Sequence, residues 1–174
     1  GRDRIEKNNG NIDKAISLYK NLLDSNKAGT LPMIELSKIA AQQEHSNDRL
    51  SWLEKARNTS PTEIQARMIL AKYYLQNKQP KKAEMYTNEA IKQSPENVDL
   101  ITLHGKVLIA QQRYSEALPS LKKLVTKLPK STTARNLLGK TFLRQQMLDN
   151  AREHLEKSLL MQQDNIVTIS LLSE

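Results

Sequence analysis

Apolar and small positions recur along the chain at a constant spacing of 34 residues. Large apolar residues occupy one column, with His104 in its remaining slot: Leu36, Leu70, Leu138 and Leu172. Small residues follow one position later, at Ser37, Ala71, Gly105, Gly139 and Ser173. Alanines hold the same register at Ala15, Ala83, Ala117 and Ala151, and prolines do so at Pro61, Pro95 and Pro129. A fixed period that runs through the whole chain indicates stacked structural repeats.

Within each period, apolar residues fall at spacings of three and four, which predicts two amphipathic helices per repeat. Residues 64–76 form one such first helix, and a second helix follows with apolar positions at Ala83, Tyr86, Ala90 and Ile91. A single pair of this kind cannot bury its apolar face alone, so neighbouring pairs must stack. The sequence therefore predicts an all-α solenoid of antiparallel helix pairs.

The prolines and capping residues between the apolar segments predict where the helices begin. The periodic proline is expected close to the start of each first helix, where a missing N–H costs little. Capping side chains are expected from Ser60, Ser94 and the Asn47-Asp48 pair.

The register divides the chain into about four full repeats and a partial repeat at each end. The predicted units are residues 2–29 (partial), 30–63, 64–97, 98–131, 132–165 and 166–174 (partial). Because the last segment starts another apolar first helix, a single array that is a fragment of a longer one is expected.

Composition narrows the functional classes. The 174 residues carry a formal net charge of +8 and no cysteine, which excludes disulfides and thiolate metal sites in this segment. No apolar run is long enough to span a membrane. The three histidines lack metal-ligand spacing, and no HExxH, P-loop or GxSxG motif is present. No catalytic residues, metal or cofactor are therefore predicted, and an enzyme is not expected.

Two segments carry a family resemblance. The run from Asn9 to Tyr19 (NGNIDKAISLY) resembles the turn and second helix of the tetratricopeptide repeat (TPR) family, and Leu138-Gly139-Lys140-Thr141-Phe142 resembles its first helix. The signature tryptophan is absent, since Met33, Arg67, Ile101 and Arg135 stand in its column. The resemblance implies a right-handed superhelix in which the first helices line a concave groove that binds protein or peptide ligands.

The columns that this resemblance assigns to the groove supply the candidate ligand-binding residues. A lysine column runs through Lys38, Lys72, Lys106 and Lys140. Apolar and polar positions accompany it: Ile34, Met68, Thr102, Asn136, Leu75, Ile109, Leu143 and Arg144. Such a groove suits an extended, acidic protein or peptide ligand, because each lysine is a mobile point charge with three donors. No small-molecule substrate is expected, and the sequence does not indicate an oligomeric state.

Two other interpretations of the lysine column stay open. It is compatible with a purely solvated face, because two ammonium groups about 10 Å apart in water repel each other by only about 0.4 kcal/mol. Binding of nucleic acid or an anionic polysaccharide is the second alternative, although the chain has few aromatic residues for base stacking. The family's carboxylate clamp is not reproduced, because lysines and large apolar residues stand in the two columns where it requires asparagines.

A narrower resemblance concerns the run from Leu31 to Gln43, Trp52-Leu53-Glu54-Lys55-Ala56-Arg57 and Ala71-Lys72-Tyr73-Tyr74-Leu75. These three segments are similar to segments of the TPR lipoproteins that belong to bacterial exosortase (PEP-CTERM) and exopolysaccharide systems. That resemblance implies a bacterial envelope or periplasmic protein in protein sorting or exopolysaccharide assembly, with the cytoplasm as the alternative location.

Three individual positions complete the predictions. His104 replaces a core leucine, so a buried hydrogen bond is expected, with a pH-sensitive contact as the alternative. Trp52 and Leu53 are expected to pack between helices, with an exposed binding hot spot as the alternative.

Overall fold

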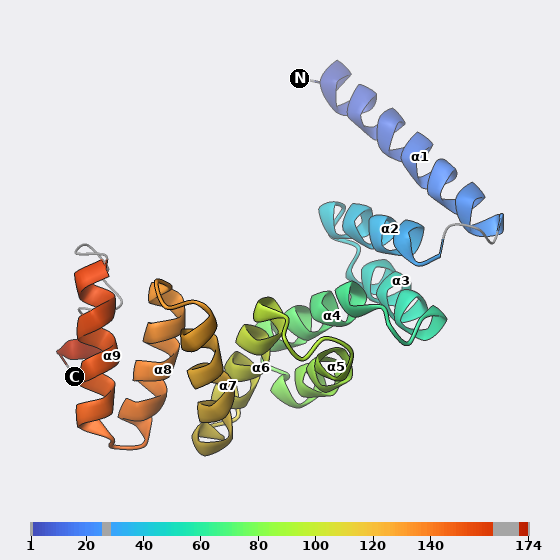
Figure 1. The fold of residues 1–174 in the computed structure, drawn as a ribbon. Coiled ribbons are helices and arrows are strands. Elements are labelled where there is room, and N and C mark those ends of the chain that lie inside the picture. The colour runs from blue at the N-terminus through green and yellow to red at the C-terminus, as the bar shows by residue number, and fades with distance from the viewer. Residues whose placement is uncertain (1, 26–28, 162–170, 174) are drawn as a thin grey trace. The chain divides into compact units, whose positions relative to one another are not determined.

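The structure is a computed structural model that describes residues 2–25, 29–161 and 171–173. Within these residues it contains nine helices and no strand (Figure 1): α1 (Arg2–Asp24), α2 (Leu31–Gln42), α3 (Ser46–Thr59), α4 (Ile64–Gln76), α5 (Pro80–Gln93), α6 (Val98–Ala110), α7 (Tyr114–Lys127), α8 (Thr132–Arg144) and α9 (Leu148–Met161). The predicted all-α fold is confirmed. The first helix predicted over residues 64–76 coincides with α4. Most of the partial helix predicted from residue 166 lies outside the described residues.

The helices form two compact units, Gly1–Leu70 and Ala71–Glu174, and the boundary between them falls inside α4. In the first unit, α1 packs on α2, and α2 pairs with α3. The centre of this unit is made by residues that are almost completely buried: Ile34, Leu36, Ala40, Leu53, Ala56, Ala66 and Leu70.

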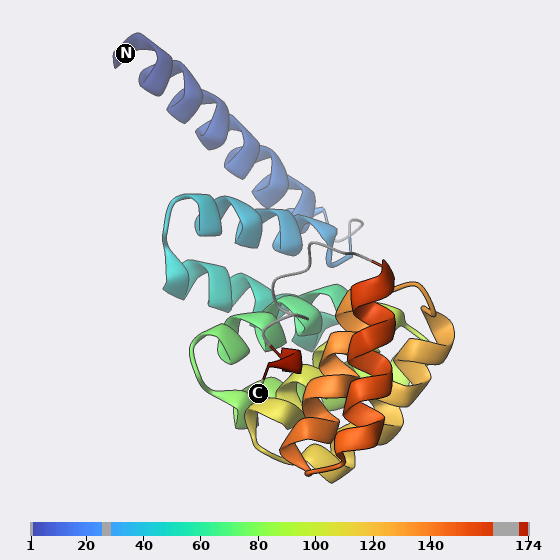
Figure 2. The same cartoon turned by 90° about the vertical axis from the view of Figure 1, so that its left-hand side faces the viewer.

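In the second unit each helix from α5 to α9 packs on the next one along the chain. Figures 1 and 2 both show α8 and α9 side by side. One contiguous core joins α6 to α9 through Ile101, Leu108, Ala117, Leu121, Leu124, Ala134, Leu138, Phe142 and Ala151. The predicted antiparallel pairs of first helices (α6, α8) and second helices (α7, α9) are therefore present in this unit.

The described turns from a first to a second helix share one backbone geometry. The second residue after the helix end has a positive φ at Glu44, Lys78, Gln112 and Gln146, with values of 56° to 59°. The next N–H then bonds back five residues, for example from Arg113 to the Leu108 carbonyl at 3.0 Å. This is the Schellman arrangement, which satisfies the carbonyls at a helix end and reverses the chain.

The helix starts differ from the sequence prediction. Pro61, Pro95 and Pro129 lie in the turns before the first helices rather than inside them. Ser60 and Ser94 are C-caps of α3 and α5. The N-caps are formed by residues further along the chain: the Asn97 side chain accepts from the Leu100 N–H at 3.1 Å, and Ser131 accepts from Ala134 at 3.2 Å. Glu63 does the same for α4 by accepting from the Ala66 N–H at 3.0 Å.

Two arginines occupy the column of the missing tryptophan and replace its packing by hydrogen bonds. Arg67 is 6% exposed and donates to the carbonyls of Ser60 (3.1 Å), Glu63 and Arg57 (3.3 Å). Arg135 donates twice to the Pro129 carbonyl, at 3.1 and 2.8 Å. In each case the guanidinium stabilises the turn that precedes the first helix, because it supplies donors to carbonyls that lie outside the helix.

The turn predicted at Asn9-Gly10 is wrong, because α1 runs through it without interruption. Residues 2–8 are polar apart from Ile5, so folding them back on the following helix would bury little apolar surface. A continuous helix keeps the backbone hydrogen bonds that such a turn would interrupt.

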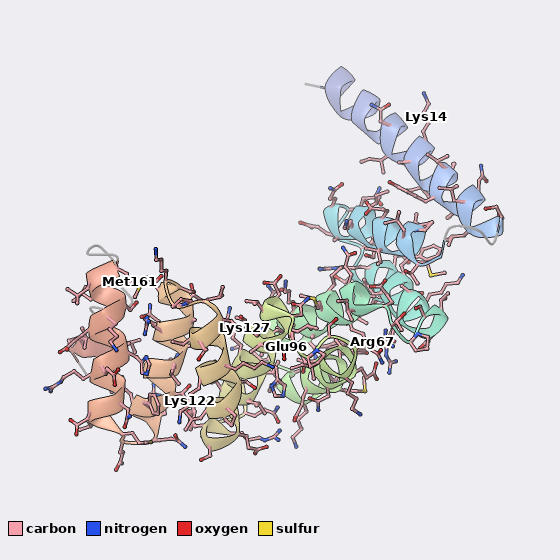
Figure 3. The ribbon with its side chains drawn as sticks, in the orientation of Figure 1. Lys14, Arg67, Glu96, Lys122, Lys127 and Met161 are labelled. Carbon is pink, nitrogen blue, oxygen red and sulfur yellow. The ribbon has the colours of Figure 1, made fainter. Side chains whose placement is uncertain are left out.

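An exposed ion-pair cluster ties the turn before α6 to α7. Glu96 pairs with Lys123 and, at 2.6 Å, with Lys127; Figure 3 labels Glu96 and Lys127. The hydrogen bonds from Lys123 and Lys127 lower the pKa of Glu96 from 4.5 to about 2. Because this pKa is lowered in the folded state, the stabilisation is present above pH 4.5 and disappears as the pH falls toward 2.

The Glu96 carboxylate is therefore expected to titrate near pH 2 when its ¹³C chemical shift is followed by NMR. In the variant Lys123→Gln plus Lys127→Gln the midpoint should move up toward 4.5, because both donors lose their charge. A midpoint near 4.5 in the unaltered protein would contradict the ion pairs.

Candidate ligand-binding surface

A pocket of about 370 Å³ lies between the end of α4 and α6 in the second unit. It is lined by Lys72, Leu75, Gln76, Asp99, Thr102, Leu103 and Lys106. The helical spacing explains this set, because residues three and four apart in α4 (72, 75, 76) and in α6 (99, 102, 103, 106) share one helix face. The structure therefore brings together four of the predicted site residues: Lys72, Leu75, Thr102 and Lys106.

The charged groups of this pocket are available to a ligand. Lys72 and Lys106 are both exposed, and neither forms an ion pair with any residue that the structure describes. Between them, Leu75 is half-buried and Leu103 is 4% exposed, so the pocket has an apolar wall. The Thr102 hydroxyl donates to the Val98 carbonyl at 2.8 Å, and its oxygen retains capacity to accept.

Asp99 is the pocket residue that sequence reasoning missed. It stands in the first turn of α6, where a carboxylate interacts favourably with the helix dipole. Because its position in the first turn already explains an aspartate there, the sequence offered no reason to assign Asp99 to a binding surface. In the pocket it adds a negative charge to a lining that otherwise has the positive charges of Lys72 and Lys106.

The other predicted residues of the second unit lie outside this pocket. Ile109 and Leu143 are half-buried and pack against the core of α6 to α9. Lys140 and Arg144 are exposed on α8, and Asn136 is half-buried on the same helix. They share the register of the pocket residues, but the structure uses two of them largely for packing.

In the first unit the predicted residues have different environments. Lys38 is paired with Glu35 at 2.7 Å and lines a cavity of about 320 Å³ with residues of α1. Ile34 is 2% exposed, so the structure contradicts its expected place on a ligand-facing surface. Ile34 lies on a different face of α2 from Leu36 and Ala40, so this helix is buried on more than one side, and burial of a large aliphatic side chain is strongly favourable. Met68 is half-buried on α4.

A polar network on the other side of α6 is structural in character. Arg113 joins Glu84 at 2.6 Å and Glu116 at 2.6 Å, and Gln111 donates to Glu84 at 2.8 Å. Burial opposes ionisation of Glu84, but the hydrogen bonds from Gln111 and Arg113 outweigh it and lower the pKa of this carboxyl. The expected hydrogen bond of His104 joins its Nδ1 and the Ser120 hydroxyl at 3.3 Å, and burial lowers the pKa of the imidazole. The imidazole is therefore neutral at physiological pH and serves the packing of α6 on α7.

The described part of the chain contains neither a cluster of metal-ligating side chains nor a membrane-spanning helix. No three His, Asp or Glu side chains there gather closely enough to hold a metal ion. No helix among the described residues combines the length and apolar character needed to cross a membrane.

Two family models match the chain. The model described as "Anaphase-promoting complex, cyclosome, subunit 3" matches residues 42–124, and the model described as "Tetratricopeptide repeat" matches residues 108–172. No curated protein matches the sequence significantly.

Solved structures of similar fold cover nearly the whole chain. YrrB, described as a TPR protein with an unusual peptide-binding site, is 17% identical over 98% of this chain and 88% of its own, with a TM-score of 0.81. MamA is 20% identical over 91% of this chain and 92% of its own, with a TM-score of 0.75. A thermophilic TPR protein of Thermus thermophilus is 19% identical over 94% of this chain and 90% of its own, with a TM-score of 0.64.

These likenesses establish the fold, and the family models add sequence evidence for the repeat. TPR proteins in general are non-catalytic scaffolds that bind protein or peptide partners. The 34-residue register, the helix pairs and the tetratricopeptide repeat model that matches residues 108–172 together support tetratricopeptide-type repeats in this chain.

Proposed function

We propose that this chain is a non-catalytic scaffold that binds an extended acidic peptide segment of a partner protein along its first helices. The observation that carries the proposal is the pocket between α4 and α6, where Lys72 and Lys106 flank an apolar wall. A carboxylate of the ligand would lie between the two ammonium groups, and a neighbouring apolar side chain would pack on Leu75 and Leu103. The peptide-binding site named for YrrB supports this use of the fold.

Charge and size both favour such a ligand. The excess of basic residues attracts an acidic segment over distance and raises its association rate. A pocket of about 370 Å³ falls at the lower end of the range for ligand sites, about 300–1,000 Å³. It therefore holds one or two side chains of a peptide that continues along α8, where Lys140 and Arg144 are exposed.

The variant Lys72→Glu plus Lys106→Glu is expected to weaken binding of an acidic peptide at least about tenfold, or about 1.4 kcal/mol. Each substitution replaces an attractive charge by a repulsive one at the pocket. The measurement is fluorescence anisotropy with a labelled peptide of alternating glutamate and leucine. Circular dichroism should show unchanged helical content, because both side chains are exposed.

The matched control is Lys81→Glu plus Lys130→Glu, which changes the net charge equally at exposed positions outside the pocket. It should reduce affinity much less than the pocket variant. Equal losses in the two variants would show that only net charge matters and would refute the pocket as the binding site.

Binding of an anionic polysaccharide or a nucleic acid is the second candidate, favoured by the net charge of +8. A single-stranded oligonucleotide or a sulfated polysaccharide would then bind more tightly than the peptide. Its affinity would also fall steeply as the salt concentration rises from about 50 to about 200 mM, as is typical of contacts to phosphate groups. The proposal includes a role in bacterial envelope protein sorting or exopolysaccharide assembly. That role rests on the sequence resemblance alone.

A further inference from the structure

Two repeats of the second unit fill the same position with a stacked aromatic pair. Tyr74 of α4 stacks on Tyr86 of α5, with ring centroids 5.7 Å apart and an interplanar angle of 4°. Phe142 of α8 stacks on His154 of α9, with centroids 5.7 Å apart and an angle of 17°. The two pairs are separated by 68 residues, which is two repeats, so they are equivalent positions of the fold.

The first unit has only half of this pair. The equivalent residues are Ala40 of α2 and Trp52 of α3, so the second helix offers a ring but the first helix does not. In the remaining repeat Leu108 is 2% exposed and Ser120 bonds to His104, so side chains of the protein occupy that position. Among these four repeats, the first is therefore the one whose residue in this column, Ala40, has a small side chain.

A cavity of about 240 Å³ is found where the missing ring would lie. It is lined by Ala40 and Trp52, by the apolar side chains of Leu36 and Ile39, and by the charged residues Lys20 and Asp48. Trp52 is half-buried, which leaves part of its indole accessible. The cavity combines an aromatic wall, an aliphatic floor and a polar rim.

Lys20 strengthens the parallel with the second unit. It stands three repeats before Lys122, whose ammonium lies 5.9 Å from the centroid of the Phe142 ring. Lys82 also lies over a ring, that of Tyr74 at 5.1 Å, but from a different position of the repeat, on α5. A lysine over an aromatic ring is a favourable cation–π contact. At the first-unit cavity Lys20 is present and the ring that it would cover is absent.

We propose that this cavity binds an aromatic side chain of a partner protein, which takes the place that Tyr74 and Phe142 fill in the other repeats. The inserted ring would contact Trp52, rest on Leu36 and Ile39, and be covered by Lys20. The volume favours a single side chain over a free small molecule, because pockets for whole small molecules span about 300–1,000 Å³. Aromatic residues are also the usual anchors at protein interfaces.

Trp52 is the only tryptophan of the chain and reports directly on the cavity. The experiment follows its indole Nε1–H signal by NMR while N-acetyl-L-tyrosinamide is added to the full chain, with N-acetyl-L-leucinamide as the comparison. The tyrosine amide should give a saturable shift of that signal, and the leucine amide should give at most a small, non-saturating one. Equal responses to both compounds would overturn the proposal.

Two variants locate the effect. Ala40→Phe is expected to fill the cavity as Phe142 does and to abolish the saturable shift. Lys20→Gln leaves the cavity open and is expected to weaken the tyrosine amide by about threefold, since exposed cation–π contacts contribute about 0.5–1 kcal/mol. Because Lys20 is exposed, this second variant tests the site even if Ala40→Phe does not fold. Undiminished binding in Lys20→Gln, or in a folded Ala40→Phe, would refute the assigned site.

Discussion

Phe142→Ala is expected to lower the free energy of unfolding of the second unit by about 3–5 kcal/mol. The Phe142 side chain is 2% exposed and belongs to the core that joins α6 to α9. Its removal would leave a cavity and also abolish the stacking on His154 and the contact with Lys122 at 5.9 Å. Since domains are stable by about 5–15 kcal/mol in total, urea unfolding followed by circular dichroism should show a large change.

The control for this prediction is Phe142→Leu, which keeps most of the buried volume and should cost much less. A loss below about 1 kcal/mol for the alanine variant would mean that the surrounding helices close over the cavity without strain. In that case the core between α8 and α9 would be far less tightly packed than the structure indicates.

Gly139→Ala is expected to be destabilising by about 1–3 kcal/mol, which is the usual range for overpacking. A Cβ at this position would lie 2.6 Å from Leu155 Cδ2 and 2.7 Å from Leu155 Cγ. Leu155 is 1% exposed, so it has little space to move away. The clash therefore outweighs the gain of up to about 1 kcal/mol that alanine normally gives over glycine in a helix.

Gly10→Ala supplies the control with the opposite sign. Apart from its chain neighbours and the nearby backbone of α1, no atom lies within 4 Å of a Cβ built at Gly10, which stands inside α1. Alanine there should raise the helical content slightly, since only the intrinsic preference changes. If Gly10→Ala instead lowers stability, the chain has a turn at Asn9-Gly10 after all.

The period of the sequence is what made the fold predictable. Columns of apolar and small residues mark the places where helices cross. A small residue such as Gly139 recurs in its column because closely packed helices leave no room there for a large side chain. The helix ends were predicted less well. Ser94 and Asn97 are both good capping residues, and only the conformation of the turn selects Asn97 as the cap of α6.

The candidate site was predictable in its basic part and not in its details. Lys72 and Lys106 share a column, so their common face follows from the period. Ile34 shares a column with Met68 and Thr102, yet it is buried, because neighbouring side chains decide the exposure of a given register position. Asp99 and the cavity beside Trp52 depend on how several helices meet, and no local pattern in the sequence records that.

The four residues with positive φ have a consequence for how this protein tolerates change. Glu44, Lys78, Gln112 and Gln146 all adopt a left-handed backbone that costs a non-glycine residue about 1–2 kcal/mol, and all four are exposed. Their side chains differ freely because nothing packs against them. Each of these turns therefore has one position where a change to glycine would alter only the backbone, without touching either of the two proposed binding surfaces.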